Sequence, residues 1–178
     1  IHRDPVHQWV CRNALIFAGR GSPSAAKADF TDADLSAARF RGANLCGVIL
    51  RRTCFRGTKD LHWARTDPGP LHSMQVLHLL MSGDGFKKSY TDLNLSELDL
   101  SYCDLRGADL AGCDLRGTRL PPIGQLADAR LKGARVDALT YEASGATPDD
   151  LAAWHDRGVE IIALEAFPLA AQERIAGE

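Results

Sequence analysis

The sequence repeats a five-residue word, a period that belongs to neither an α-helix nor a regular β-strand. The stretch CDLRGADLAGCDLRG at 103–117 shows the word three times, each with a small residue, an Asp and a Leu. We number each word from its central large residue, i, so that the small residue is i−2 and the polar residue i−1. Because a helix repeats every 3.6 residues and a strand every two, a five-residue period predicts a short extended segment followed by a corner.

The word recurs in two blocks, 28–57 and 90–146, and keeps its phase between them, with one extra residue after Leu120. Large residues at i and small residues at i−2 are expected to fill a narrow core without voids. Gly is frequent at i+2, where a corner requires unusual backbone angles. The predicted structural core consists of Phe30, Leu35, Phe40, Leu45, Leu50, Phe55, Leu95, Leu100, Leu105, Leu110, Leu115, Leu120, Leu131, Val136 and Tyr141.

These words resemble the A(D/N)LXX word of the pentapeptide-repeat family. The resemblance implies a right-handed quadrilateral β-helix, in which four words make one square coil and i and i−2 point inward. The expected fold class is therefore mainly β, a solenoid with N-terminal, internal and C-terminal helical caps. Its coils would stack at the β-strand spacing of about 4.8 Å.

The segments outside the words predict caps, because the outer coils of a solenoid otherwise expose core and unpaired edges. Asp4-Pro5 and Thr147-Pro148 are typical helix starts, each a capping residue followed by Pro. The expected organisation is an N-terminal cap helix at 1–27, word blocks at 28–57 and 90–146, a loop and helical insertion at 58–89, and a C-terminal cap helix and tail at 147–178.

The insertion contains LHSMQVLHLLM at 71–81, which predicts a helix that is apolar nearly all round. A helix of this kind must bury more than one face. Two interpretations stay open: the helix packs against the solenoid, or it forms a contact with a partner or a second copy. Under the second interpretation the candidate partner-binding residues are Leu71, Met74, Leu77, Leu80 and Met81.

The sequence predicts no catalytic residues, no metal site and no cofactor. The five Cys include no CxxC pair, and Cys103 and Cys113 occupy i−2, where they are expected to fill the core. His72 and His78 are six residues apart, a spacing that does not suit an HExxH site. No apolar run reaches the roughly 18 residues of a membrane span. We therefore expect a non-enzymatic chain with reduced thiols, located in the cytoplasm.

The expected function is a protein-binding scaffold module. Pentapeptide-repeat modules also occur in larger bacterial proteins, including secreted effectors, and a chain that starts at Ile1 without Met agrees with an excised module of that kind. Nucleic acid is not an expected partner, because no aromatic residues interleave with the Arg at i+1. A homodimer through the insertion or the C-terminal segment is a further expectation.

The alternative function is suggested by family members that mimic duplex DNA and bind a type II topoisomerase such as gyrase. A mimic needs strong negative potential along its length, and the acidic words at 97–115 suggest one. However, coils of twenty residues, with the extra residue after Leu120, predict an Arg directly above three of these carboxylates, which would neutralise them. The predicted stacked pairs are Asp99–Arg119, Asp109–Arg130 and Asp114–Arg135.

Overall fold

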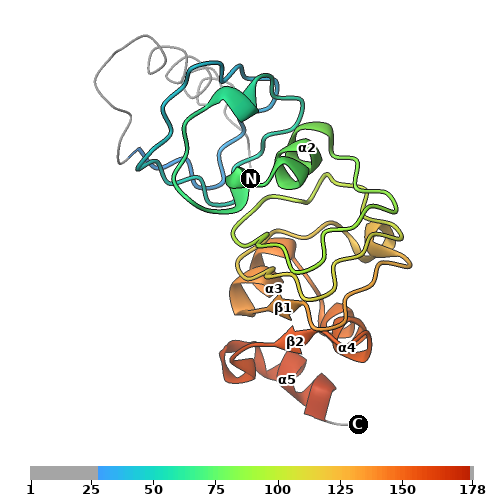
Figure 1. Ribbon diagram of the computed structural model, residues 1–178. Helices are drawn as coiled ribbons and strands as arrows, with labels where there is room; N and C mark the ends of the chain where they lie inside the picture. The colour runs from blue at the N-terminus through green and yellow to red at the C-terminus, as the bar shows by residue number, and fades with distance from the viewer. Residues whose placement is uncertain (1–27, 177–178) are drawn as a thin grey trace. The chain divides into compact units, whose positions relative to one another are not determined.

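The computed structural model describes residues 28–176 (Figure 1). The chain divides into two compact units, one ending at Gly83 and the other beginning at Asp84. The N-terminal cap helix predicted over 1–27 lies outside the described residues.

Stacked coils make up most of the first unit. One residue in every word pairs through an isolated parallel bridge with a residue in the next coil, so four words complete one coil of twenty residues. One extra residue enters the coil after Lys59. The bridges are Asp29–Ile49, Asp34–Cys54, Arg39–Lys59 and Asn44–Arg65.

A helical segment follows the coils of the first unit. It contains two 3₁₀ turns and one helix: η1 Leu61–Trp63, η2 Pro70–His72 and α2 Met74–Ser82.

Helix α2 begins three residues later than the sequence predicts. The side chain of Ser73 accepts a hydrogen bond from the backbone N–H of Val76, so Ser73 caps the helix and the preceding residues form η2 instead. The helix remains tied to the coils of its own unit, because the N–H of Gly57 donates to the carbonyl of Met81 at 2.8 Å.

The second unit repeats the coil. Its bridges begin at Asp84, so the second block of words starts earlier than the predicted residue 90. The extra residue predicted after Leu120 is confirmed, because the last bridges join residues 21 positions apart. The bridges are Asp84–Asp104, Ser89–Asp109, Asn94–Asp114, Asp99–Arg119, Asp109–Arg130 and Asp114–Arg135.

The last coil is closed by the C-terminal segment. Strand β1 (Arg135–Val136) belongs to the last coil and pairs in parallel with β2 (Glu160–Ile161), so β2 covers an edge that would otherwise be unpaired (Figure 1). The helical elements of this unit are η3 Ile123–Leu126, α3 Ala138–Ser144, α4 Pro148–Asp156, η4 Leu164–Ala166 and α5 Leu169–Ala176.

Helix α4 forms where the sequence predicts the second cap helix. Thr147 and Asp150 form a reciprocal capping box, in which each side chain accepts the other residue's backbone N–H. Leu151 and Trp154 are buried on this helix. None of the described helices has the length and apolar content that crossing a bilayer requires.

The expectation of a mainly β chain needs a correction. Among the described residues, regular strands are limited to β1 and β2, of two residues each, and the coils otherwise pair through isolated bridges. The reason is the short word: each side of a coil offers one residue for pairing before the chain turns. The stacking is therefore parallel and β-like, although the sides are too short to count as strands.

The predicted core residues at i are buried, with one exception. Leu50 is half-buried, and no bridge joins its word to a later coil. Leu61 and Leu126 are buried core residues that the predicted words omit, and each follows an extra residue that shifts the phase. Tyr141 is buried on α3 rather than in a coil.

The corners at i+2 have the predicted left-handed backbone. Gly112 has a φ of 68°, which a residue without a Cβ adopts at no cost. Some words place a non-glycine residue in the same conformation, for example Ala37 with a φ of 61°. The corner geometry therefore belongs to the word and not to the glycine alone.

Candidate binding surface

The Asp or Asn at i−1 has a structural task in the corner. Oδ1 of Asp99, for example, accepts a hydrogen bond from the backbone N–H of Ser101 at 3.0 Å. This turn replaces a backbone partner with a side-chain oxygen. It recurs at Asp29, Asp34, Asn44, Asp84, Asn94, Asp104, Asp109 and Asp114.

The three predicted stacked ion pairs are confirmed. Each pair joins an Asp at i−1 to an Arg one coil later, and each is also a bridge pair of the backbone. The carboxylates are therefore largely compensated by neighbours within the second unit. The N–O distances are 3.6 Å for Asp99–Arg119, 3.7 Å for Asp109–Arg130 and 3.5 Å for Asp114–Arg135.

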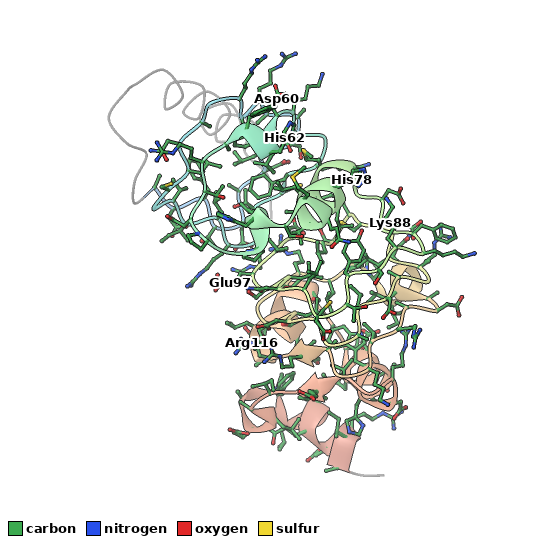
Figure 2. All side chains as sticks on the ribbon, viewed as in Figure 1. Asp60, His62, His78, Lys88, Glu97 and Arg116 are labelled. Carbon is green, nitrogen blue, oxygen red and sulfur yellow. The ribbon has the colours of Figure 1, made fainter. Side chains whose placement is uncertain are left out.

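Asp114 carries the densest of these networks. Its Oδ1 and Oδ2 accept hydrogen bonds from Nε and an Nη of Arg116 at 2.8 and 2.6 Å, and Arg135 lies above. These cations hold the pKa of the Asp114 carboxyl below its ordinary value, with the hydrogen bonds from Arg116 as the main cause. Figure 2 labels Arg116 on its coil.

Two polar residues at i−2 in the second unit have hydrogen-bond partners inside the core. The hydroxyl of Thr118 donates to the carbonyl of Leu95 at 2.6 Å, and the thiol of Cys113 donates to the carbonyl of Tyr90 at 2.9 Å. Cys103 and Cys113 are buried, as predicted for core fillers. Burial raises the pKa of the Cys113 thiol to about 11, so it remains protonated and is a poor nucleophile near neutral pH. Within residues 28–176, no group of three or more His, Cys, Asp or Glu could hold a metal ion.

The predicted partner-binding residues on the insertion separate into two groups. Leu77 and Leu80 are buried, so the prediction that they contact a partner is wrong. The reason is that one face of α2 packs within the structure. Met74 is highly exposed, and Leu71 and Met81 are partly buried.

Trp63 is an exposed residue that the sequence analysis missed. It ends η1, which contacts α2, and its ring lies 5.3 Å from that of His62, labelled in Figure 2. The sequence could have indicated this exposure, because Trp63 lies where the five-residue word ends and so does not belong to the core pattern. Trp63 and Met74 thus expose large apolar side chains from neighbouring parts of one segment.

One side of the first unit stacks positive charges. Arg39 and Lys59 are bridge partners in successive coils, both exposed, and Arg41 is exposed two residues further on. Among the described residues, no carboxylate forms an ion pair with any of the three, including the neighbouring Asp60. Arg39 and Lys59 both stand at i−1 of their words. At the same word position in the second unit, Asp99 and Arg119 are bridge partners and form an ion pair.

Stacked coils of five-residue words define a repeat protein whose outer surface is set by three residues of each word. The family model for pentapeptide repeats matches residues 27–59 and 91–121, in eight copies. The chain therefore contains pentapeptide repeats, as the resemblance carried by its words predicts. No curated protein matches the chain.

Proposed function

We propose that the chain is a non-catalytic scaffold module that binds a protein partner through the segment between its two blocks of words. The observation that carries the proposal is the exposure of Trp63 and Met74, which are 64% and 63% exposed. Trp and Met are enriched at protein interfaces, and Trp is frequent among the residues that dominate binding energy.

The frame behind this surface supports the same role. In the first unit, the buried hydroxyl of Thr53 donates to the carbonyl of Phe30 at 2.9 Å, and corners are held by side-chain oxygens such as that of Asp34. A frame ordered in this way loses little conformational freedom on binding. We infer that its coils are the right-handed squares of the family. One bridge per word, four words per coil and a left-handed residue at most corners support this shape, and parallel β crossovers are almost always right-handed.

The proposal is tested with the double variant W63A/M74A and the control I49A. Ile49 is an exposed apolar residue of a coil outside the segment. Immobilised wild type and I49A should capture the same protein from extracts of the source cells, and W63A/M74A should lose it. Matching melting curves would show that all three fold. Retention of the protein by the double variant would refute the proposal, as would its loss from both variants.

The identity of the captured protein distinguishes a homodimer from a complex with a different protein. A homodimer would appear as a second copy of the chain and would be detected by sedimentation. A role as a module of a larger bacterial protein, cytoplasmic or secreted, rests on the family resemblance.

The alternative function, a DNA mimic that binds a topoisomerase, has weaker support. Its requirement is a continuous negative surface, whereas Asp99, Asp109 and Asp114 each pair with an Arg. A mimic would inhibit DNA supercoiling by gyrase in vitro, and we expect no inhibition.

A further inference from the structure

Stacking imposes a charge rule on the outer surface of this protein. The residues at i−1 in successive coils are bridge partners, about 4.8 Å apart, so opposite charges at this position stabilise the stack and like charges destabilise it. Asp99 and Arg119 obey the rule with an ion pair of 3.6 Å. Arg39 and Lys59 break it, because two cations are stacked at the equivalent position.

The second unit shows how the rule is usually met. Most of its exposed cations are matched by nearby carboxylates, and the first unit achieves the same match where Arg52 binds Asp32 at 2.9 Å. Where the second unit stacks like charges, at Asp84 and Asp104, each carboxylate has its own cation, Lys88 or Arg106. A stacked pair of like charges without a described counter-charge, as at Arg39 and Lys59, is therefore a departure that the fold does not require. The matched cations of the second unit include Lys88, Arg106, Arg116, Arg119, Arg130, Arg135 and Arg174.

A local conflict that costs stability and has no structural compensation is typical of a functional site. The three cations Arg39, Arg41 and Lys59 form what we term the basic side. It adjoins η1, because only Asp60 separates Lys59 from the first residue of that turn, and η1 ends at the exposed Trp63. Positive charge and an aromatic anchor therefore lie in one stretch of the first unit.

We infer that the basic side binds an acidic segment of the protein partner. This inference rests on the proposed function and names the chemistry of the partner at that site. Carboxylates of such a segment would form charge-assisted hydrogen bonds with the two stacked cations, and an apolar residue beside them would contact Trp63. A duplex nucleic acid fits less well, because the whole chain has a net charge of −2 and three cations would release few counterions.

The decisive variant is R39D. An Asp at this position would recreate beneath Lys59 the arrangement that Asp99 makes beneath Arg119, including the corner hydrogen bond to the following N–H. The variant should therefore melt a few degrees above the wild type, by about 1–3 °C, while it loses affinity. A structural role alone would not raise stability and lower binding together.

The binding probe is a short fluorescent peptide that alternates Glu and Leu, measured by anisotropy at low salt. R39D should weaken its binding ~10-fold. The control K132D makes the same charge change at an exposed residue of the second unit, and its affinity should stay within about twofold of the wild type. A duplex DNA is added as competitor in a separate series.

Four results would overturn the inference: no binding of the peptide by the wild type, unchanged binding by R39D, an equal loss in K132D, or stronger binding of the duplex DNA than of the peptide. A lower melting temperature for R39D would also overturn the inference, since it would show that stacking Arg39 on Lys59 does not destabilise the fold. The capture experiment keeps the two proposals apart. Capture that is lost in W63A/M74A and kept in R39D refutes the acidic segment alone, and capture that is kept in W63A/M74A refutes the proposed function.

Discussion

Removal of the Asp114 carboxylate tests whether the acidic words are structural. D114A deletes the acceptor for Arg116, the neighbour of Arg135 and the oxygen that holds the corner. D114N keeps an oxygen for the corner N–H of Arg116 and removes the charge. Comparison of the two variants therefore separates the contribution of the corner hydrogen bond to stability from that of the ion pairs.

The expected cost follows from the geometry of the site. Asp114 is 12% exposed and accepts two short hydrogen bonds from a guanidinium, and bonds to charged groups contribute about 1.5–3 kcal/mol each when well ordered. Arg116 is 48% exposed, and water replaces part of what is lost, since exposed ion pairs contribute only about 0–1 kcal/mol. D114A should lower the free energy of unfolding by about 2 kcal/mol and D114N by about 1 kcal/mol.

The pH dependence supplies a second readout with a defined sign. The pKa of Asp114 is lower in the folded protein than its ordinary value of 3.8, so the charge contributes stability above about pH 4 and this contribution is lost as the pH falls through the folded pKa. The difference between wild type and D114N should be constant from neutral pH down to about pH 5 and should shrink below it.

Urea unfolding followed by circular dichroism gives the free energy of unfolding of each variant, and its dependence on pH, by linear extrapolation. Asp104 provides a control, because it binds Arg106 in the same way but has Gln125 rather than an Arg one coil later, and D104A should cost less than D114A. A cost below about 0.5 kcal/mol for D114A, the range of ordinary surface changes, would refute the reasoning. A gap between wild type and D114N that persists at low pH would refute the assigned role of the charge.

Four further variants test the frame, each by the same urea experiment. G133A should cost about 1–2 kcal/mol through its left-handed φ of 72° alone. G112A should cost about the same through its φ of 68°, because the nearest atom that its Cβ would meet is the end of the exposed Asp92 side chain, which can turn away; a clearly larger cost would show that Asp92 cannot move. A37G should stabilise the protein by about 0.5 kcal/mol, since Ala37 has a φ of 61° and is exposed, and a loss would contradict the strain. T118V should cost about 1 kcal/mol, because it removes a buried hydroxyl that donates to a carbonyl, and an unchanged midpoint would show that this bond adds nothing.

The five-residue word predicted the stacked coils because each of its positions has a separate structural requirement. Leu105 must fill the core, Gly107 must turn left-handed, and the period of twenty follows once four words close a coil. The stacked pair Asp114–Arg135 could be predicted for the same reason, since it needs only the coil length and one extra residue.

The candidate site was harder to predict because it lies where the word stops. No period constrains 58–83, so the exposure of Trp63 and the burial of Leu77 depend on how one segment packs. A helix that is apolar nearly all round gives no sign of which face is covered. Leu126 was missed for a smaller reason: it lies five residues before Leu131 and obeys the word, but its neighbours Pro121 and Pro122 obscure the pattern.

The same regularity that predicts the frame makes departures from it informative. In a solenoid, each outward residue has a known neighbour one coil away, so the favourable partner for every charge can be read from the sequence. Asp at i−1 is satisfied twice, once by the corner N–H and once by an Arg above it, as Asp114 shows. Arg39 at the same position gives up the corner bond and faces Lys59. Since the word would accept Asp there, the absence of this simple remedy is the strongest reason to assign the basic side a partner.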